Sequence, residues 1–496
     1  MSRCAGAPVT ESAALDRSGP AVARLYHRLL AVNFLIAWAS LGAQVDVLIG
    51  SRGLLPLAPF LAAARARGLD MMQVPTVFWL DASDAALHAG IWIGAALSAA
   101  ALLGIRPRLC TGLATALYLS YASAGRTFLS FQWDNLLLEC GLLALFLPTE
   151  RPAPWAHTLF RILLFKLYWE SGIAKWQSYL GDWQSGSAMR FYYETAPLPA
   201  WPAWYAHHLP VWWHHLESWV VLVLELVLPF FFFGPRLLQL SSCAALTAFQ
   251  LINLATSNYG FFVYLALALH VFLLTDRDVG RLAAPLRRWG PARAAPARPP
   301  CSAAPRQRLL RIAGAAAVTA IFVGVSALDA IAAFVPTPRA WQRFAAPLQA
   351  LYEPWRLINT YHLFGHITEE RIEPEFQVES DGAWRTFDLH YKPGPVQRAP
   401  AFVAPHQPRV DFQLWFYGLS FQHGTPAYVA ALLDRLCHDP AAAQPLFVET
   451  LPPNPEAVRI EFWRYRFSPR DEPRAWWTRE PVATTRPISC RGETAP

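Results

Sequence analysis

Long runs of uncharged, mostly apolar residues constrain this chain more than any other feature. A helix needs roughly 17 to 25 apolar residues to cross a bilayer. Runs of this kind occupy residues 29–45, 85–103, 109–125, 237–256, 259–275 and 312–328. With 54% hydrophobic and only 16% charged residues, the chain is also too apolar for an ordinary soluble protein of 496 residues. These runs predict a polytopic α-helical membrane bundle.

Three further apolar runs contain charged residues. They are 135–149 with Glu139, 158–174 with Arg161, Lys166 and Glu170, and 213–233 with Glu217 and Glu225. We expect them to span the membrane as well, which gives about nine spans. Re-entrant or interfacial helices are the alternative for the first two runs, because short apolar segments often adopt that arrangement.

The positions of the basic loops predict the orientation of the bundle. With nine spans, the basic N-terminal tail, the loops around 106–108, 150–151 and 234–236, and the arginine-rich linker fall on one face, which the positive-inside rule makes cytoplasmic. The loops 50–84, 126–132 and 175–212 then lie outside. The sequence then divides into a cytoplasmic tail (1–24), a transmembrane helical domain (25–275), a basic cytoplasmic linker (276–308), a last transmembrane helix (309–335) and an exterior C-terminal domain (336–496). The linker is rich in Pro, Ala and Arg, so we expect it to be irregular.

The exterior region has the patterns of a soluble, β-rich α+β domain. Apolar and polar residues alternate over 384–391, as in a half-buried strand, and 409–416 and 458–467 are similar. Residues 426–438 place their apolar side chains on one helical face. Cys437 and Cys490 could form a disulfide in an oxidising compartment, and two unpaired thiols are the alternative.

Several separate motifs stand out from this background. The membrane part contains FQWDNLLLECG, ESGIAKWQSYLGDW, YYETAPLP and WYAHHLP. Further on come LINTYHLFGHITEERIE, HYKPG, DFQLWF, WRYRF and a Trp-Trp pair. Together and in this order, they resemble the lipase maturation factor family over about residues 25 to 480. The motif positions are Gln132, Trp133, Asp134, Glu139, Gly172, Lys175, Tyr193, Glu194, Pro197, Tyr205, His207, His208, Asn258, Tyr259, Asn359, Thr360, Tyr361, Phe364, Gly365, Lys392, Pro393 and Gly394.

The resemblance implies a multi-pass membrane factor that acts like a chaperone. Such a factor assists the folding or assembly of secreted lipases or related exported proteins, and its exterior C-terminal domain contacts the client. Membrane lipids are the other expected partner. The net charge of +7 comes mostly from the linker, so we expect no nucleic-acid partner, and no cofactor is implied. Three lysines among many arginines and short cytoplasmic loops favour a bacterial inner-membrane protein with a periplasmic C-terminal domain.

A second resemblance supports an enzymatic alternative. The segment from Gly172 to Trp176, with Lys175 inside it, is faintly similar to the membrane domain of the vitamin K-dependent carboxylase group. This similarity implies an integral-membrane enzyme acting on a lipid or quinone-like substrate, with Lys175 as base and His207 or His208 assisting. An interfacial anchor is the other interpretation of Lys175. No nucleophile elbow, Walker A loop or Rossmann fingerprint is present, so we expect a non-enzymatic role.

Other charged clusters have simpler interpretations. Lys166 and Glu170 are four residues apart and are expected to form an ion pair within one helix. The histidines near His207 and His214 lack the spacing of a zinc-binding helix, so no metal site is expected. Asp134 and Glu139 lie five residues apart, on different sides of a helix, and we expect a structural role for both.

Overall fold

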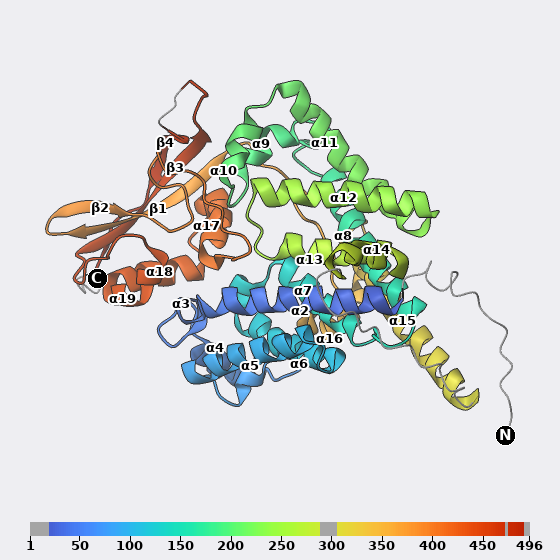
Figure 1. Ribbon diagram of the computed structural model, residues 1–496. Helices are drawn as coiled ribbons and strands as arrows, with labels where there is room; N and C mark the ends of the chain where they lie inside the picture. The colour runs from blue at the N-terminus through green and yellow to red at the C-terminus, as the bar shows by residue number, and fades with distance from the viewer. Residues whose placement is uncertain (1–18, 288–304, 472–474, 491–496) are drawn as a thin grey trace.

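The chain forms a helical region followed by a region built around a small β-sheet. The computed structural model describes residues 19–287, 305–471 and 475–490, so most of the expected tail and the middle of the expected linker lie outside the described residues. Figure 1 shows the sheet with α17, α18 and α19 at one end of the molecule and the helical region at the other. This arrangement confirms the predicted helical part and C-terminal part with a sheet.

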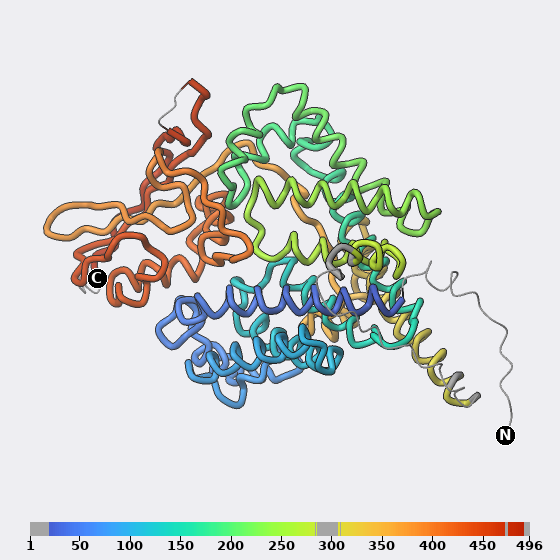
Figure 2. Tube along the Cα trace, viewed as in Figure 1, coloured from blue at the N-terminus to red at the C-terminus, as the bar shows by residue number. Residues whose placement is uncertain are grey.

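Helices extend over nearly all of the described N-terminal region. They are α2 (Pro20–Gly42), α3 (Val45–Ile49), α4 (Leu57–Ala66), α5 (Asp84–Leu102), α6 (Pro107–Ala124), α7 (Gln132–Ala144), α8 (Pro154–Trp176), α9 (Ala188–Thr195), α10 (Trp201–His207), α11 (Val211–Leu226), α12 (Arg236–Thr256), α13 (Phe262–His270), α14 (Asp276–Arg287), α15 (Pro305–Phe334) and α16 (Arg339–Tyr352). Figure 2 traces the chain from this region into the sheet.

Only some of these helices have the length and composition of a membrane span. Among the described residues, 4 segments qualify by both criteria: Asp84–Leu102, Val211–Phe233, Arg236–Thr256 and Leu309–Phe334. The other predicted spans are helical, but α7 has 13 residues and α13 has 9, fewer than the roughly 17 to 25 that a bilayer requires. The total of about nine spans therefore stays a prediction.

The linker between the predicted helical domain and the last predicted span is not irregular throughout. Residues Asp276–Arg287 form α14, an amphipathic helix with Asp276 and Asp278 in its first turn. Acidic residues at this end of a helix are favourable because they face the positive end of the helix dipole. Asp276 also accepts hydrogen bonds from the backbone amides of Gly19, Ala21 and Val22. The expectation of a fully irregular linker was wrong for these residues.

Between residues 371 and 490, the described part of the chain forms a five-stranded antiparallel sheet and three α-helices. Its elements are β1 (Arg371–Ser380), β2 (Ala383–Phe387), α17 (Arg409–Ser420), α18 (Ala427–His438), α19 (Pro440–Ala443), β3 (Ala457–Phe467), β4 (Trp477–Thr484) and β5 (Ile488–Ser489). The strand order is β2-β1-β3-β4, and β5 pairs with β3. The strand predicted at 384–391 ends at Phe387, and the predictions of β3 and α18 are confirmed.

The segment predicted as a strand at 409–416 is the helix α17. Its alternating apolar residues Val410, Phe412 and Leu414 are buried, but so are the polar residues between them. A helix that is buried on most sides loses the one-sided pattern that distinguishes helix from strand. Gly418 lets α17 approach β1, since a Cβ at that position would lie 2.0 Å from the carbonyl oxygen of Ile372. The strand prediction was wrong for this reason.

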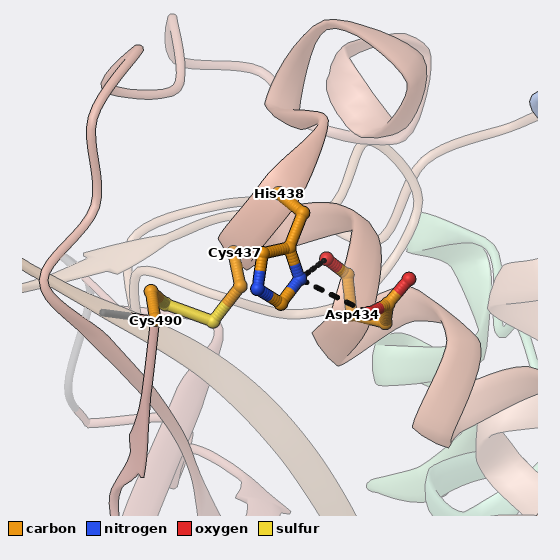
Figure 3. Close-up of a disulfide and its surroundings, with 4 residues drawn as sticks. All are labelled: Asp434, Cys437, His438 and Cys490. Atoms are coloured by element: carbon orange, nitrogen blue, oxygen red, sulfur yellow. Dashed lines mark hydrogen bonds and ion pairs between the residues drawn. A yellow bond between two sulfur atoms is a disulfide. The ribbon is translucent and has the colours of Figure 1, made fainter. Parts of the chain in front are cut away.

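A disulfide joins the helical and strand parts of the C-terminal region. Cys437 at the end of α18 is bonded to Cys490, which follows β5, across a sequence separation of 53 residues (Figure 3). Figure 3 also shows His438 beside Asp434, whose carboxylate lies 3.0 Å from the His438 Nδ1. Of the two alternatives for these cysteines, the structure contains the disulfide.

Candidate functional site

The predicted motif residues meet at the boundary between the helical region and the C-terminal region. The centre of this boundary is an irregular segment, residues 359–367, which we name the strap. Backbone groups outside helices and sheets need other hydrogen-bond partners when they are buried. Side chains of the helical region supply them: Gln132, Glu139, Glu170 and Asp182 accept from strap amides, and Lys175 and Trp183 donate to strap carbonyls.

Glu139 is the most heavily bonded residue along the strap. It lies fully buried on α7, and its carboxylate forms an ion pair with Lys166 of α8 at 3.0 Å. The same carboxylate accepts hydrogen bonds from the Tyr361 hydroxyl at 2.6 Å and from the Asn359 amide at 3.1 Å. Glu170 accepts from the Tyr361 amide at 2.8 Å instead of pairing with Lys166. The ion pair expected within one helix is therefore replaced by a pair between two helices.

Lys175 is also fully engaged. Its ammonium lies 2.6 Å from the carboxylate of Glu225 on α11 and donates to the carbonyl oxygen of Leu363 in the strap at 2.8 Å. Only 3% of the residue is exposed, so it is not the interfacial anchor considered above. A general base needs a free lone pair, and an ammonium held between two acceptors has none. This geometry assigns Lys175 to binding the strap.

A second buried ion pair fixes α17 against the helical region. Arg409 binds both carboxylate oxygens of Asp134, at 2.8 and 2.9 Å, and donates to the carbonyl oxygen of Phe128 at 2.6 Å. The Tyr118 hydroxyl donates to the same carboxylate at 2.6 Å. Bidentate pairs of this kind are among the strongest charged hydrogen bonds in proteins. The structural role expected for Asp134 is thus a contact between the two regions.

Asn258 and Glu194 extend the boundary on the other side. The Asn258 side chain accepts from the amides of Val403 and Ala404 at 2.7 and 2.9 Å and donates to the carbonyl oxygen of Ala401 at 2.8 Å. Glu194 accepts from the amide of Phe467, the last residue of β3, at 2.7 Å. These asparagine and glutamate side chains satisfy backbone groups that a separate C-terminal domain would expose.

Arg371, the first residue of β1, reaches back into the helical region. Its guanidinium donates to the carbonyl oxygens of Glu194 and Pro197 at 3.2 and 3.0 Å and pairs with Glu373. Lys392 lies 2.6 Å from the other oxygen of Glu373. Burial lowers the pKa of Lys392, and burial raises the pKa of the nearby Asp411 to about 6. The motif residues 392–394 therefore belong to a buried charged cluster beneath the sheet.

Two motif glycines allow close packing around Lys175. A Cβ on Gly172 would lie 3.0 Å from the Leu226 side chain, and a Cβ on Gly365 would lie 3.3 Å from the Ala174 Cβ. Phe364, with φ +53°, directs its ring onto Tyr259 at a centroid distance of 4.8 Å. The strap therefore lies directly against α8, and Thr360 within it is partly buried.

Aromatic motif residues continue the same boundary. Trp133 packs on Phe412 of α17, with ring centroids 5.1 Å apart. Tyr205 is exposed and lies 6.3 Å from the Trp476 ring. Tyr193 donates to Glu217 at 2.9 Å. These contacts join α7 and α10 to the C-terminal region and α9 to α11.

The histidines near α10 form structural contacts. His207 packs on Phe467 at 5.5 Å, and His208 lies 2.7 Å from the carbonyl oxygen of Trp204. Burial, with the positive neighbours His208, His214 and Arg190, lowers the pKa of His207 to about 4. Within the described ranges, no group of three or more His, Cys, Asp or Glu side chains is placed to hold a metal ion.

Sequence reasoning missed several residues of this boundary. Arg409 lies two residues before Asp411, where the DFQLWF motif begins. Arg371 lies near the end of the LINTYHLFGHITEERIE motif. Neither was among the candidate site residues. Asp182, in the motif ending GDW, accepts from the Ile367 amide at 2.7 Å and was overlooked as well. For Arg409, the available signal was a charge beside the mostly apolar DFQLWF motif, because burying such a group requires a partner.

Comparison with known proteins identifies relatives along both regions. The model of the lipase maturation factor transmembrane domain matches residues 21–281, and that of the lipase maturation factor C-terminal domain matches residues 357–487. Lipase maturation factor 2 of Homo sapiens is 29% identical, over 92% of this chain and 81% of the relative. Lipase maturation factor 1 of Bos taurus is 29% identical, over 91% and 86%, and lipase maturation factor 2 of Gallus gallus is 28% identical, over 91% and 79%. No solved structure matches the chain.

Proposed function

This chain belongs to the lipase maturation factor family, and from that membership we propose that it is a membrane-embedded factor that assists the folding or assembly of secreted lipases or related exported proteins. The observation that carries the proposal is the buried polar boundary between the two regions. It holds the C-terminal domain in a fixed position beside the helical bundle. A client bound to that domain would therefore be held at a defined place next to the membrane.

The proposed topology has about nine spans, a cytoplasmic N-terminus and an exterior C-terminal domain. Contacts on the C-terminal side support it: Arg52 pairs with Asp439, Phe128 accepts from Arg409, and Asp182 accepts from Ile367. These partners come from three loops that the charge pattern assigns to the exterior. The Cys437–Cys490 disulfide supports an oxidising compartment for this domain, of which the bacterial periplasm is one.

Contacts among the predicted cytoplasmic loops support the same topology. Arg24 donates to the carbonyl oxygen of Thr149, and Arg236 pairs with Asp278. Arg108 donates to the carbonyl oxygen of Leu145. These arginines lie in segments that the positive-inside rule places in the cytoplasm, and their partners lie in the linker or near the end of the predicted span 135–149.

We place client contact in a groove beside the sheet. It has a volume of about 680 Å³ and is lined by Leu180, Glu369, Ile372, Leu419 and Phe421, among others. Leu180 and Leu419 are exposed, as is Phe416 on the same helix as Leu419. Exposed apolar side chains beside a rim of carboxylates suit a partly folded segment with apolar and basic residues.

An integral-membrane enzyme remains the alternative from another class. It would need Lys175 as base, and the ion pair with Glu225 is unfavourable to that role. His207 and His208, which would assist, contact the C-terminal region and the backbone of α10.

Deleting the gene from the native host would have different consequences under the two functions. Profiling of secreted proteins, with lipase assays, would compare the native host with and without it. The maturation factor predicts loss of specific secreted lipase activities, restored by wild type. An unchanged secretome with an altered lipid or quinone pool would contradict this function and favour the enzyme.

A Leu419→Asp substitution tests the groove. We expect it to remove rescue of secreted lipase activity while the protein level stays unchanged. Val448→Asp, at another exposed apolar position in the domain, serves as control. Full rescue by Leu419→Asp would place the client elsewhere.

A further inference from the structure

Two adjacent cavities lie beside α9, α11 and α12 (Figure 1), and the inner one extends to α8, α13 and the strap. The outer cavity has a volume of about 340 Å³ and apolar walls that include Trp213, Leu216, Val220, Leu224 and Ile252. This is within the range of roughly 300 to 1,000 Å³ that is usual for small-molecule sites. The inner cavity, of about 40 Å³, is lined by Tyr168, Lys175, Glu225, Gln250 and Tyr259, among others.

The two cavities share five lining residues, so they form neighbouring parts of one site. The shared residues are Met189, Tyr192, Val221, Phe249 and Asn253. Trp213, Val220 and Ile252 on the outer wall are exposed, and they lie on the segments Val211–Phe233 and Arg236–Thr256, which are apolar enough to cross a membrane. A bilayer crossed by these two segments would place its acyl chains against the exposed outer wall of this cavity.

The inner cavity contains an unused hydrogen-bond acceptor. Gln250 is 2% exposed, and its Nε2 donates to the Tyr168 hydroxyl at 2.9 Å. Its Oε1 has no hydrogen-bond partner among the residues that the structure describes. A buried amide oxygen without a partner is costly, so a donor is expected there. The 40 Å³ beside it are enough for a water molecule or a hydroxyl group.

The charges of the inner cavity select a neutral head group. Lys175 and Glu225 neutralise one another at 2.6 Å. A carboxylate would bring its negative oxygens against Gln250 Oε1 and the Glu225 carboxylate. We propose that this site binds a neutral single-chain lipid with a hydroxyl head group, such as a long-chain alcohol or a monoacylglycerol. The chain fills the outer cavity, and the hydroxyl donates to Gln250 Oε1. This inference does not rest on the proposed function.

Photolabelling of the full-length protein in lipid nanodiscs tests the site. The probe is oleyl alcohol carrying a diazirine, and mass spectrometry maps the labelled peptides. We expect saturable labelling of α11 and α12, with oleyl alcohol competing about tenfold better than oleic acid, because one hydrogen bond separates them. Labelling that does not saturate, or competition by the acid as strong as by the alcohol, would overturn the proposal and leave a water-filled site.

Variants on α12 make the test specific. Ala245 lines the outer cavity and Ala244 does not. Ala245→Phe should lower labelling by about tenfold or more, whereas Ala244→Phe should leave it unchanged. Gln250→Leu should remove the preference for the alcohol over the acid while the protein remains folded. Equal labelling of Ala245→Phe and wild type, or a preserved preference in Gln250→Leu, would contradict the assignment.

Discussion

At the scale of single residues, the charged side chains inside this protein bind the backbone of a distant segment. Glu139, Lys175 and Asp134 occupy positions where a membrane protein usually carries functional ionisable groups. Each has at least one partner in the strap or in α17. The contacts that these side chains make between the two regions explain why they are buried, without a catalytic role.

The Asp134–Arg409 pair gives a direct prediction. Arg409→Leu leaves the buried Asp134 carboxylate without its cation, and removing one partner of such a pair typically costs about 3 to 5 kcal/mol. We expect a matching loss in the free energy of unfolding, measured by tryptophan fluorescence in detergent. Arg385→Leu, at an exposed position in β2, is the control. A loss no larger than that of the control would show that the pair does not hold α17.

His207 makes stability depend on pH. Its pKa is lowered to about 4 by burial first and by positive neighbours second, against an ordinary value of about 6.5. Its contribution is therefore fully present above pH 6.5 and is lost as the pH falls from 6.5 towards 4, at a cost of about 2 kcal/mol by pH 5. His207→Gln should show a smaller fall in Tm between pH 7 and pH 5 than wild type. An identical fall in both proteins would exclude this role, and His390→Gln controls for an exposed histidine.

At the scale of elements, the strap is the segment on which the two regions depend. Its backbone is held by helix side chains, so loosening one contact should open it locally. Tyr361→Phe removes the hydroxyl bonded to Glu139, and we expect faster hydrogen exchange of the strap amides, by about tenfold. Tyr205→Phe, on an exposed ring, is the control. Unchanged exchange in the strap would mean that this bond does not hold it.

The disulfide belongs to the same scale, since it ties α18 to the segment after β5. Removing a native disulfide from a small domain typically costs about 2 to 5 kcal/mol. Cys437→Ser should lower Tm, and a reducing agent should lower the Tm of wild type but leave that of the variant unchanged. A wild-type Tm that is insensitive to reduction would contradict a stabilising disulfide.

How far the sequence could predict these elements depended on how each is buried. Apolar length and periodicity predicted α12, α18 and β3, because each has one type of environment along its face. The alternation of apolar and polar residues wrongly predicted a strand at α17, which is buried on most sides. The proline content of the linker wrongly predicted an irregular segment at α14. Many motif residues meet at the boundary between the two regions, but their partners lie far away in the sequence: Asp134 and Arg409 are 275 residues apart, and no spacing rule reaches that far.

At the scale of the whole molecule, the two regions form one structure. Deleting 336–496 would leave Asp134, Glu139 and Glu194 without their partners, so we expect the remaining helical region to be destabilised as well. The measurement is the amount and Tm of the truncated protein in membranes. A truncated protein as stable as full length would show that the buried boundary adds little.

Replacing Lys175 and Glu225 together shows whether client maturation needs lysine chemistry or only the bound strap. The double variant Lys175→Gln/Glu225→Gln keeps hydrogen-bonding groups beside Leu363. It removes both charges and the amine of Lys175. In a host lacking the wild-type gene, secreted lipase activity would be assayed at equal protein level. If the chain is a maturation factor that uses Lys175 to hold the strap, the double variant restores lipase activity to near the wild-type level. Loss of rescue by a folded double variant, with a changed lipid pool, would contradict the account and make Lys175 a chemical residue.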